Sequence, residues 1–405
     1  MNTLIFVSVD ELWLKGKNRR LYVKAITEHI SKVLKAYMPA KFEIRNENQR
    51  LAIFLSGDVD ETNLAKTVEA LTRVPGIFTV SVSHACAKDL QVMGELGINL
   101  FNKLQKEGKF PKSFKVVSTR TDKRFPVTTP EINIEVGGII FLHFESLGLK
   151  VDLHKPELVL DIRILNDSAY LSTEVYPGMG GLPVGTSGHV VTMLSGGLDS
   201  PVASYLMSKR GCSQVFVFFF AYPFVGDEVK DKIVKLCSQL AKFQSRTQLY
   251  IIPFGAVQQQ IGQACHSEYR TILFRAYMIK VANMLAKKID AEAICTGDSL
   301  GQVSSQTLTN MALVDRVSER IVLRPLLGHN KREIIDQARK IGTYETSILP
   351  YDDACSLFAP KKPIIRGDLG YFTKFIEENS FDQLLNQAIL DAEIYRFQVD
   401  GKILE

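Results

Sequence analysis

The sequence has no long hydrophobic segment and no export signal. Its longest apolar run, 215–225, has 11 residues, whereas a helix that spans a membrane needs about 18. The N-terminus lacks a basic stretch ahead of its first apolar residues and soon reaches the acidic pair Asp10 and Glu11, which is unlike a secretory signal. We therefore expect a protein of the cytoplasm that makes no membrane contact.

Cysteine is scarce and is not arranged in a metal-binding or disulfide pattern. The six cysteines lie at positions 86, 212, 237, 265, 295 and 355, and no two of them form a CxxC pair. This spacing excludes the common zinc motifs and a disulfide framework, and it fits a reducing compartment. The sequence predicts no metal centre built by the protein alone.

Neither sign of charge dominates, and the composition is that of an ordinary globular protein. Lys and Arg number 49 against 44 Asp and Glu, which gives a formal net charge of +5. Apolar residues make up 46% and charged residues 23%, which excludes a disordered or fibrous chain. The small positive excess is compatible with a polyanionic partner. A chain of 405 residues usually forms two or three domains.

Three blocks of the chain differ in their pattern of apolar residues. Residues 1–60 combine strand-like runs with a helix-like stretch at 22–36, and residues 61–166 alternate helix and strand patterns up to a strand at 158–165. Both blocks are typical of small α+β domains. Residues 167–188 include YPGMGGLPVGTSG, whose five glycines and two prolines in 13 residues predict a linker or a close-approach loop.

From residue 189 to residue 405 the pattern alternates between short apolar runs and amphipathic stretches. This alternation predicts a doubly wound parallel sheet with helices on both faces. The run at 215–220 is apolar throughout, as expected for a strand that is buried on both sides. The predicted strands are 190–194, 215–220, 249–253, 291–295 and 321–323, and the predicted helices are 201–210, 227–243, 269–288 and 331–341.

The strongest local signal is a hexapeptide between a predicted strand and a predicted helix, SGGLDS at 195–200. Its glycines would let backbone N–H groups approach an anion, and the helix N-terminus would add partial positive charge. The chain has no GxxxxGK[ST] motif, which excludes the common NTP hydrolase loop. The hexapeptide therefore predicts a loop that binds pyrophosphate. The alternative is a glycine turn that only closes a β/α unit.

This hexapeptide resembles the PP-loop of the ATP-pyrophosphatases, enzymes that cleave ATP to AMP and pyrophosphate. Three longer segments are similar to the tRNA 4-thiouridine synthetase family (ThiI-type tRNA sulfurtransferases): GLPVGTSGHVVTMLSGGLDSPVA, TGDSLGQVSSQTLTNM and RPLLGHNKREIIDQARKIGTYETSILPYDDACSLF. The N-terminal ELWLKGKNRR also resembles this family, and FKVVSTRTDKRFP is similar to a THUMP domain, which is an RNA-binding module. The resemblance runs from about residue 10 to about residue 360.

The resemblance implies a multidomain fold of α/β and α+β type. Residues 1–60 would form a ferredoxin-like domain, residues 61–166 a THUMP domain, and residues 189–405 a PP-loop domain of the adenine nucleotide α-hydrolase type, with 167–188 as a linker. The implied reaction is ATP-dependent replacement of the 4-oxygen of a uridine, at position 8 of tRNA, by sulfur. Adenylylation of that oxygen would release pyrophosphate, and AMP would leave later. ATP, Mg²⁺ and tRNA are the implied ligands.

The nucleotide contacts of the family map onto residues around the hexapeptide. Residues just before it would line the adenosine site, the end of the next strand would add two more, and one helix would add an arginine. The alternative for the apolar members is that they are ordinary core residues. Phe218 replaces the polar residue or histidine that relatives often have, so only a backbone contact would carry over there. The implied nucleotide-binding residues are Met193, Leu194, Ser195, Gly196, Gly197, Ser200, Phe218, Phe219, Arg275, Gly297 and Gln306.

Two charged residues are implied near the reacting phosphate. Asp199 would position Mg²⁺ on the phosphates or orient the reacting oxygen, and we favour the metal-linked role because polyphosphate would repel a bare carboxylate. The alternative is that Asp199 caps the following helix. Lys331 would neutralise charge at the reacting phosphate, and its alternative is a solvated lysine at a helix start.

Cys355 matches the family's catalytic cysteine, which carries sulfur as a persulfide. The alternative for any single cysteine is a small buried hydrophobic residue. Many relatives have a second cysteine where this chain has Ala354, and none of the 50 residues after Cys355 is a cysteine. We therefore expect no rhodanese domain, and sulfur would come directly from a cysteine desulfurase. Cys265 lacks a CxxC partner, and two thiolates are too few for a conventional iron–sulfur cluster.

Basic residues cluster in the THUMP-like segment and near the N-terminus. Residues 101–126 contain eight basic and two acidic side chains, and such a stripe would neutralise RNA phosphates and read RNA shape rather than base sequence. The alternative is a solvated basic face. The implied RNA-binding residues are Lys15, Lys17, Lys112, Lys115, Arg120, Lys123 and Arg124.

Three other functions remain open from the residues alone. A PP-loop ligase or amidotransferase that acts on a small metabolite would not need a basic N-terminal half. A sulfur carrier for thiazole synthesis in the thiamine pathway would use Cys355, and family members with a rhodanese domain can play that part. A pure RNA-binding module would not need the intact hexapeptide. The oligomeric state is open as well, with a homodimer as one form.

Overall fold

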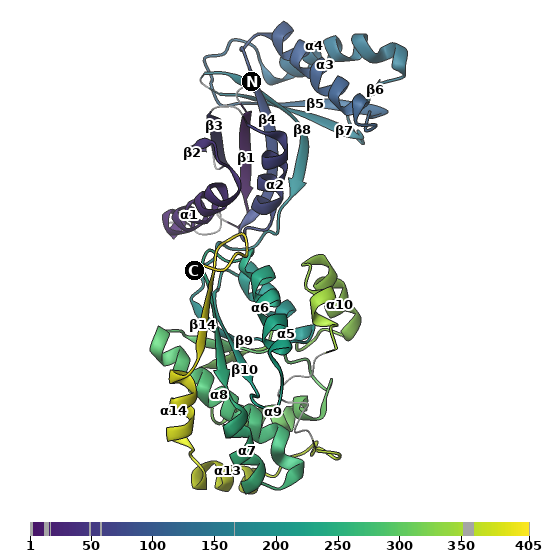
Figure 1. The fold of residues 1–405 in the computed structure, drawn as a ribbon. Coiled ribbons are helices and arrows are strands. Elements are labelled where there is room, and N and C mark those ends of the chain that lie inside the picture. The colour runs from purple at the N-terminus through teal and green to yellow at the C-terminus, as the bar shows by residue number, and fades with distance from the viewer. Residues whose placement is uncertain are drawn as a thin grey trace. The chain divides into compact units, whose positions relative to one another are not determined.

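Figure 1 shows the computed structural model, which describes residues 3–11, 16, 18–47, 50–56, 59–165, 167–350 and 360–404. The chain divides into two units. The first comprises Met1–Asp10, Tyr37–Thr72 and Ile77–Gly180, and the second comprises Glu11–Ala36, Arg73–Gly76 and Gly181–Glu405. None of the helices in the described segments combines the length and the hydrophobicity that crossing a bilayer requires.

The described part of the first unit contains one eight-stranded sheet. Its strands are β1 (Thr3–Val9), β2 (Lys41–Glu47), β3 (Arg50–Ser56), β4 (Ile77–Cys86), β5 (Ser113–Arg120), β6 (Lys150–Val151), β7 (Leu158–Ile164) and β8 (Ala169–Pro177). The strand order is β2-β3-β1-β4-β8-β7-β5-β6. Because β4 pairs with β1 and with β8, hydrogen bonding is continuous across the two predicted N-terminal domains.

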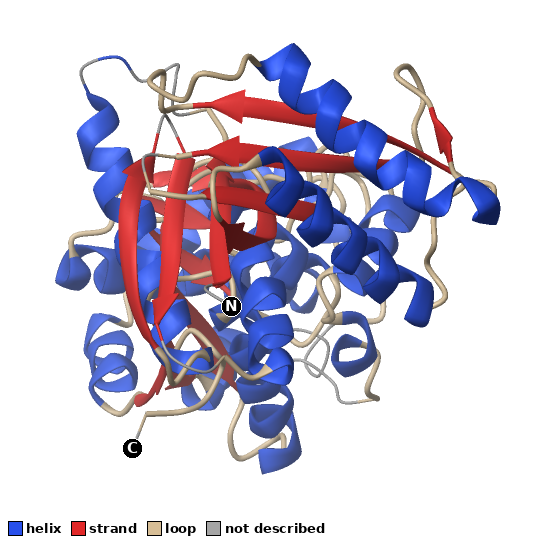
Figure 2. Cartoon of the chain, turned by 90° about the horizontal axis from the view of Figure 1, so that it is seen from above, coloured by secondary structure: helices blue, strands red, loops and turns tan. Residues whose placement is uncertain are grey.

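Helices cover the β5–β7 half of this sheet on one face. They are α3 (Leu90–Lys106) and α4 (Thr129–Phe144), which lie side by side (Figures 1 and 2). A shorter helix, α2 (Glu61–Thr72), packs on β4. Phe114 and Val116 of β5 are buried in the core that these helices form. Since successive side chains of a strand alternate between faces, Lys115 points to the opposite face of the sheet.

The predicted linker at 167–188 is not irregular throughout. Residues 169–177 form β8, because Ala169, Tyr170 and Leu171 are buried in the core of the first unit. The irregular part begins after this strand and is a close-approach loop. Gly181 has a φ of +82°, and a Cβ there would lie 2.0 Å from the carbonyl oxygen of Lys209, so only glycine fits.

The described part of the second unit contains a six-stranded sheet. Its strands are β9 (His189–Met193), β10 (Ser213–Phe220), β11 (Thr247–Pro253), β12 (Ala293–Cys295), β13 (Ile321–Leu323) and β14 (Glu393–Phe397), in the order β13-β12-β9-β10-β11-β14. The first five are parallel, as predicted. The sequence analysis did not anticipate β14, which pairs antiparallel with β11 and makes the sheet mixed at that edge.

Helices cover both faces of this sheet, as its apolar strands require. Phe216 of β10 packs with Leu236 on one face, and the next-but-two residue, Phe219, packs with Tyr277 on the other. The helices that lie wholly or mostly in this unit are α1 (Arg19–Tyr37), α5 (Asp199–Lys209), α6 (Asp227–Ala241), α7 (Gly255–Ala264), α8 (Arg270–Ile289), α9 (Leu308–Asp315), α10 (Lys331–Lys340), α11 (Tyr344–Ser347), α13 (Leu369–Glu378) and α14 (Asp382–Leu390). Of these, α7, α9, α11, α13 and α14 were not predicted.

Candidate functional site

The candidate site lies where the strand order of the second unit reverses. β9 is hydrogen-bonded to β10 on one side and to β12 on the other, so the chain leaves β9 toward β10 and returns to its other side at β12. In open α/β sheets, ligands bind outside the carboxyl ends of the strands at such a switch point. The hexapeptide at 195–200 follows β9, and residues 296–298 follow β12.

A cavity of about 220 Å³ lies at this edge of the sheet. It is lined by every predicted nucleotide-binding residue except Gly196 and Gly197, and by the predicted catalytic residue Asp199. The structure therefore brings together side chains from β9, β10, α8 and the loop after β12. Three further residues line the cavity that the sequence analysis did not single out: Met278, Thr296 and Asp298.

The sequence held a signal for these three residues. Thr296 and Asp298 flank Gly297 in the segment TGDSLGQVSSQ, and Met278 lies three positions after Arg275 on α8. Residues three apart in a helix share a face, so Met278 faces the cavity with Arg275. Spacing within these two segments would have been enough to include all three.

The apolar wall of the cavity is also part of the core. Leu194, Phe218 and Phe219 are only 3 to 5% exposed and belong to the two core clusters of the second unit. The alternative that these three residues are core residues is therefore correct, and the same residues also line the cavity. A ligand in the cavity would contact side chains that are already packed in the core.

Close packing explains the glycines and serines around the loop. The Ser195 amide donates to Ser200 Oγ over 2.8 Å, and the two serine hydroxyls are 3.0 Å apart. A Cβ on Gly297 would lie 2.6 Å from the Ser200 amide nitrogen, so the loop after β12 can approach α5 only with glycine there. At Gly197 a Cβ would meet only Ser195 Oγ, at 3.7 Å, so the fold leaves open space at that position.

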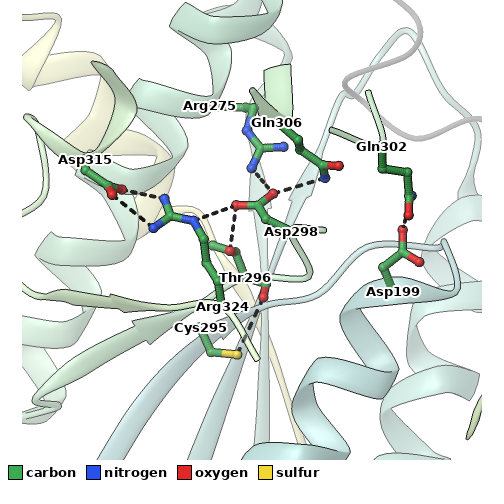
Figure 3. Close-up of polar contacts among 9 residues, drawn as sticks. All are labelled: Asp199, Arg275, Cys295, Thr296, Asp298, Gln302, Gln306, Asp315 and Arg324. Carbon is green, nitrogen blue, oxygen red and sulfur yellow. Dashed lines mark hydrogen bonds and ion pairs between the residues drawn. The ribbon is translucent and has the colours of Figure 1, made fainter. Parts of the chain in front are cut away.

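Asp199 is the first residue of α5, two positions earlier than the predicted helix start at Pro201. The helix cap is Leu198, which makes no side-chain cap hydrogen bond, so the capping alternative for Asp199 is wrong. Its Oδ1 accepts from Lys331 Nζ over 2.7 Å, and its Oδ2 accepts from Gln302 Nε2 over 2.8 Å; the Gln302 contact is drawn in Figure 3. Asp199 is therefore part of an ion pair with Lys331.

Lys331 reaches Asp199 because the start of α10 is fixed by a capping box. The Asn330 side chain accepts from the amides of Arg332 and Glu333 at 3.0 and 3.1 Å, and the Glu333 carboxylate accepts from the Asn330 amide at 2.8 Å. Lys331 is thus a lysine at a helix start, as its alternative required. It nevertheless forms an ion pair at the site, with 46% of its side chain exposed.

A second carboxylate, Asp298, lies at the centre of a polar network in the cavity wall (Figure 3). Its Oδ1 accepts from Arg275 and, over 3.2 Å, from Gln306 Nε2. Its Oδ2 accepts from Thr296 Oγ1 over 2.8 Å and from Arg324 Nε over 3.1 Å. Two arginines from α8 and from the loop after β13 therefore hold one buried carboxylate.

The charge of Asp298 is compensated although the residue is only 2% exposed. Burial by itself would raise the pKa of this carboxyl. The positive charge of Arg275, the hydrogen bond from Thr296 and the charge of Arg324 outweigh burial, and the pKa of Asp298 falls to about 2. Asp298 is therefore ionised at neutral pH and can only accept hydrogen bonds.

The cysteine that the sequence analysis favoured, Cys355, lies outside the described residues. The five described cysteines are partly or fully buried. Burial raises the pKa of each of their thiols: that of Cys86 rises to about 11, and those of Cys212, Cys237, Cys265 and Cys295 also rise. Because the thiolate is the reactive form, these five thiols are poorly suited to sulfur transfer.

In the first unit, the segment after β5 has a fixed shape. Arg120 donates through one terminal nitrogen to the carbonyl oxygens of Phe125 and Val127, both at 2.8 Å. The buried carboxylate of Asp122 accepts from Lys88 Nζ at 2.9 Å and from Arg124 Nε at 3.1 Å. Arg120 thus shapes this loop from within, and it is less available to RNA than its inclusion among the RNA-binding residues implied.

The other predicted RNA-binding residues differ in how open they are. Lys112, Lys123 and Arg124 are exposed, Lys115 is partly exposed on the uncovered face of β5, and Lys15 and Lys17 lie outside the described residues. Elsewhere in the same stripe, Lys103 pairs with Glu61 and Lys109 with Glu107, each at 3.0 Å. The stripe therefore contains both neutralised and uncovered lysines.

Three family models match consecutive parts of the chain. The model described as ThiI ferredoxin-like domain matches residues 4–81, the THUMP domain model matches residues 88–174, and the model described as thiamine biosynthesis protein (ThiI) matches residues 185–381. The last match includes the cavity, the hexapeptide and Lys331.

Relatives of similar length resemble the whole chain. A Brevibacillus brevis protein named probable tRNA sulfurtransferase is 35% identical over 391 residues, which are 96% of this chain and 95% of the relative. A Geobacillus protein of the same name is 38% identical over 389 residues, with 96% and 94% covered. A protein from Alkaliphilus metalliredigens, also of that name, is 36% identical and is covered completely.

Solved structures agree with the sequence comparison. The chain is similar over its full length, with a TM-score of 0.87 and 29% identity, to a 4-thiouridine synthetase crystallised as an RNA complex with bound ATP. It is also similar in fold to a Pyrococcus horikoshii protein, with a TM-score of 0.64 and 22% identity over 84% of this chain.

Proposed function

The chain belongs to the tRNA sulfurtransferase family of ThiI type, and on that premise we propose that it makes 4-thiouridine at position 8 of tRNA with ATP as the activating substrate. The observation that carries this proposal is the cavity at the switch point, where the hexapeptide, Arg275 and the Asp199–Lys331 pair converge. A small-metabolite ligase would use a similar loop. The tRNA sulfurtransferase relatives, which match over nearly their whole length, favour the RNA substrate instead.

The residues of the cavity suit a bound nucleotide whose triphosphate extends out of the cavity beside the loop at Gly197. The apolar wall of Phe218 and Phe219 would hold the adenosine half, and the open space at Gly197 would admit the phosphates. The helix α5 begins at Asp199, directly after this glycine-containing loop, and a helix N-terminus favours an anion. Lys331 would then neutralise negative charge that develops at the reacting phosphate.

Magnesium fits this arrangement through a single carboxylate. Mg²⁺ in nucleotide sites is commonly held by one or two carboxylates together with phosphate oxygens. Both carboxylate oxygens of Asp298 already accept two hydrogen bonds each. Asp199 is therefore the carboxylate that would hold the ion beside the phosphates. When bound, Mg²⁺ would neutralise phosphate charge and favour the departure of pyrophosphate.

The uridine oxygen needs activation because it is a poor leaving group. Attack of the uracil 4-oxygen on the α-phosphorus would form an adenylylated base and release pyrophosphate. The terminal sulfur of a Cys355 persulfide would then bond to the ring carbon as AMP departs. One external thiol would attack Cys355 Sγ, which releases the thiolated tRNA and leaves a mixed disulfide on Cys355. A second thiol would reduce that disulfide and restore the Cys355 thiolate. A cysteine desulfurase would reload the Cys355 thiolate with sulfur.

The described cysteines support Cys355 as the carrier. A persulfide forms on a thiolate, and burial raises the pKa of all five thiols that the structure describes. None of them lines the cavity. The first unit would bind the tRNA, with Lys123 and Arg124 facing solvent on a loop that Asp122 and Arg120 hold in shape. We place the reaction in the cytoplasm, and a homodimer is compatible with it.

Nucleoside analysis of tRNA from cells that lack this protein tests the function. We expect 4-thiouridine to disappear and to return when the wild-type gene is restored. The Cys355→Ser variant should fail to restore it, because a serine hydroxyl cannot store sulfur at the persulfide level. The matched control, Cys265→Ser, should restore it. Thiouridine that persists without the protein would refute the proposal.

A second function is favoured by the description of the matched family model, which names thiamine biosynthesis. A sulfur carrier for thiazole synthesis would need Cys355 but neither the cavity nor the RNA-binding unit. Cells with Asp199→Ala should then grow without thiamine, whereas cells with Cys355→Ser should require it. Growth of both variants without thiamine would exclude this second role.

A further inference from the structure

The cavity contains a buried acceptor that no described group satisfies. The side chain of Gln306 lines the cavity and the residue is 7% exposed. Its Nε2 donates to Asp298, whereas its Oε1 accepts no hydrogen bond from the described residues. Buried polar atoms of native proteins almost always have a partner, so this oxygen marks a place where a ligand is expected to supply a donor.

Asp298 decides which end of the Gln306 amide is turned toward it. The oxygen and nitrogen of a glutamine amide are told apart by their hydrogen-bond partners. Because Asp298 is ionised and can only accept, the amide must turn its NH₂ group to Asp298 Oδ1 and its oxygen away. The orientation of Gln306 therefore follows from the charge of its neighbour.

The carboxylate itself is held from its other side. Thr296 Oγ1 and Arg324 Nε donate to Oδ2 at 2.8 and 3.1 Å, and Arg324 is in turn paired with Asp315 (Figure 3). Arg324 is 9% exposed at its side chain, so water does not compete strongly for it. A carboxylate with donors on both oxygens cannot rotate freely, and it fixes the direction of the Gln306 oxygen.

Few groups of ATP can donate to such an acceptor. At neutral pH the triphosphate oxygens only accept hydrogen bonds. The donors lie on the nucleoside half, namely the 6-amino group of adenine and the two ribose hydroxyls. GTP has a carbonyl oxygen in place of the 6-amino group, which would face the Gln306 oxygen with a second acceptor.

We propose that Asp298 is a positioning residue that makes Gln306 Oε1 the acceptor for one donor of the nucleoside, and thereby selects ATP against nucleotides that lack this donor. The inference rests on the proposed use of ATP in this cavity. It adds a role for Asp298, which the cavity geometry assigns through Gln306 rather than through contact with the reacting atoms.

The first experiment measures binding of ATP, 2′-deoxy-ATP, 3′-deoxy-ATP, purine riboside triphosphate and GTP to the full chain by titration calorimetry without tRNA. One of the analogues that differ from ATP by a single group should bind at least about tenfold more weakly than ATP, because the missing donor group leaves the buried Gln306 Oε1 without a hydrogen bond. Which analogue is weak identifies the donor as amino group or hydroxyl. If all analogues bind as ATP does, the inference is wrong; if ATP does not bind at all, the proposed function fails instead.

The second experiment separates positioning from a general structural role. Asp298→Asn keeps the size of the side chain but lets either end of the Gln306 amide face it, so the ratio of ATP affinity to analogue affinity should fall at least about fivefold. Asp315→Asn is the matched control, because it also removes a carboxylate from Arg324 but does not touch Gln306. The control should keep the wild-type ratio.

A third variant covers the case in which Asp298→Asn does not fold. Gln306→Leu removes the acceptor and leaves the Asp298–arginine contacts in place, so the affinity ratio should approach one. Thermal unfolding of each variant checks that it is folded. Wild-type selectivity in a folded Asp298→Asn or in Gln306→Leu would overturn the inference.

Discussion

Asp122 in the first unit and Asp298 in the second are both buried carboxylates that accept hydrogen bonds from two cationic side chains. They differ in what happens to the cations. Around Asp298 the two arginine side chains are 20% and 9% exposed, whereas Arg124 beside Asp122 is 82% exposed. The same pairing therefore fixes geometry inside a cavity in one unit, and it fixes a loop that presents positive charge to solvent in the other.

This contrast suggests a division of labour between the two units. Charge that is cancelled inside a cavity sets directions for hydrogen bonds, and charge that is left on the surface attracts a polyanion at long range. Substitutions in the second unit should therefore act on nucleotide chemistry and on stability. Substitutions in the loop of the first unit should act on the affinity for RNA and on its dependence on salt.

The largest effect is expected from Asp199→Ala. It removes the partner of Lys331 and the carboxylate nearest the phosphates, so thiolation in vitro should fall at least about a hundredfold. The dissociation constant for tRNA, measured by filter binding, should stay within about twofold of wild type. Gln302→Leu is the control, because it removes one hydrogen bond and leaves the ion pair, and it should cost much less. Activity of Asp199→Ala within a few-fold of wild type would break the division.

A smaller effect is expected when four basic residues of the first unit, Lys112, Lys115, Lys123 and Arg124, are replaced by alanine together. Each lost phosphate contact lowers the log–log slope of affinity against salt by about 0.7 to 0.9, so four would lower it by roughly three. ATP binding should not change. The matched control is Lys103→Ala with Lys109→Ala, whose charges are already paired with Glu61 and Glu107. An equal change in slope for the control would show that pairing does not decide which lysines meet RNA.

A stability difference should separate the two buried carboxylates. Asp298→Ala removes a buried carboxylate from two poorly exposed arginines, of which Arg324 keeps its pair with Asp315, and the breaking of a buried pair costs on the order of 3–5 kcal/mol. Asp122→Ala leaves Lys88, whose side chain is 25% exposed, and Arg124, whose side chain is 82% exposed and solvated by water, so its cost should be smaller. Thermal unfolding at pH 7 measures both variants under the same conditions. Equal shifts in melting temperature would contradict the contrast in cation exposure.

The smallest effect concerns pH. The pKa of Asp298 is about 2 in the folded protein and about 3.9 for an ordinary aspartate. A carboxyl whose pKa is depressed on folding stabilises the protein fully above the unfolded pKa, and this contribution is lost as pH falls toward the folded pKa. The difference in melting temperature between wild type and Asp298→Asn should therefore be constant from pH 8 to 5 and shrink below about pH 4. A difference that changes between pH 8 and 6 would point to another group.

Much of the second unit could be predicted from local patterns. The apolar run at 215–220 lies within β10, and the amphipathic stretch at 331–341 corresponds to α10. The edge strand β14 could not be predicted, because only Phe397 of its five residues is buried and its sequence EIYRF has no clear alternation. This segment is a strand because it forms hydrogen bonds with β11, whose residues lie 140 or more positions earlier in the chain.

The candidate site was predicted unevenly for a related reason. Residues within a continuous segment that resembles the family, such as Ser195 and Gly297, could be predicted because the resemblance lies in consecutive residues. The partners of Asp199 were not found, since Lys331 and Gln302 lie 132 and 103 positions away. The alternative that Asp199 caps the helix was wrong, because it considered only the segment around Asp199.

The sequence by itself determined the identity of the loop, the alternation of strands and helices, and the resemblance that names the family, because each of these is written in consecutive residues. Only the tertiary structure decided which charges meet. The order of strands around β9 brings the ends of β9 and β12 together, and that closeness pairs Asp199 with Lys331 and surrounds Asp298 with donors from α8 and the loop after β13. Distance in space, and not spacing along the chain, sets the energy of a charge pair, so these contacts follow from the fold.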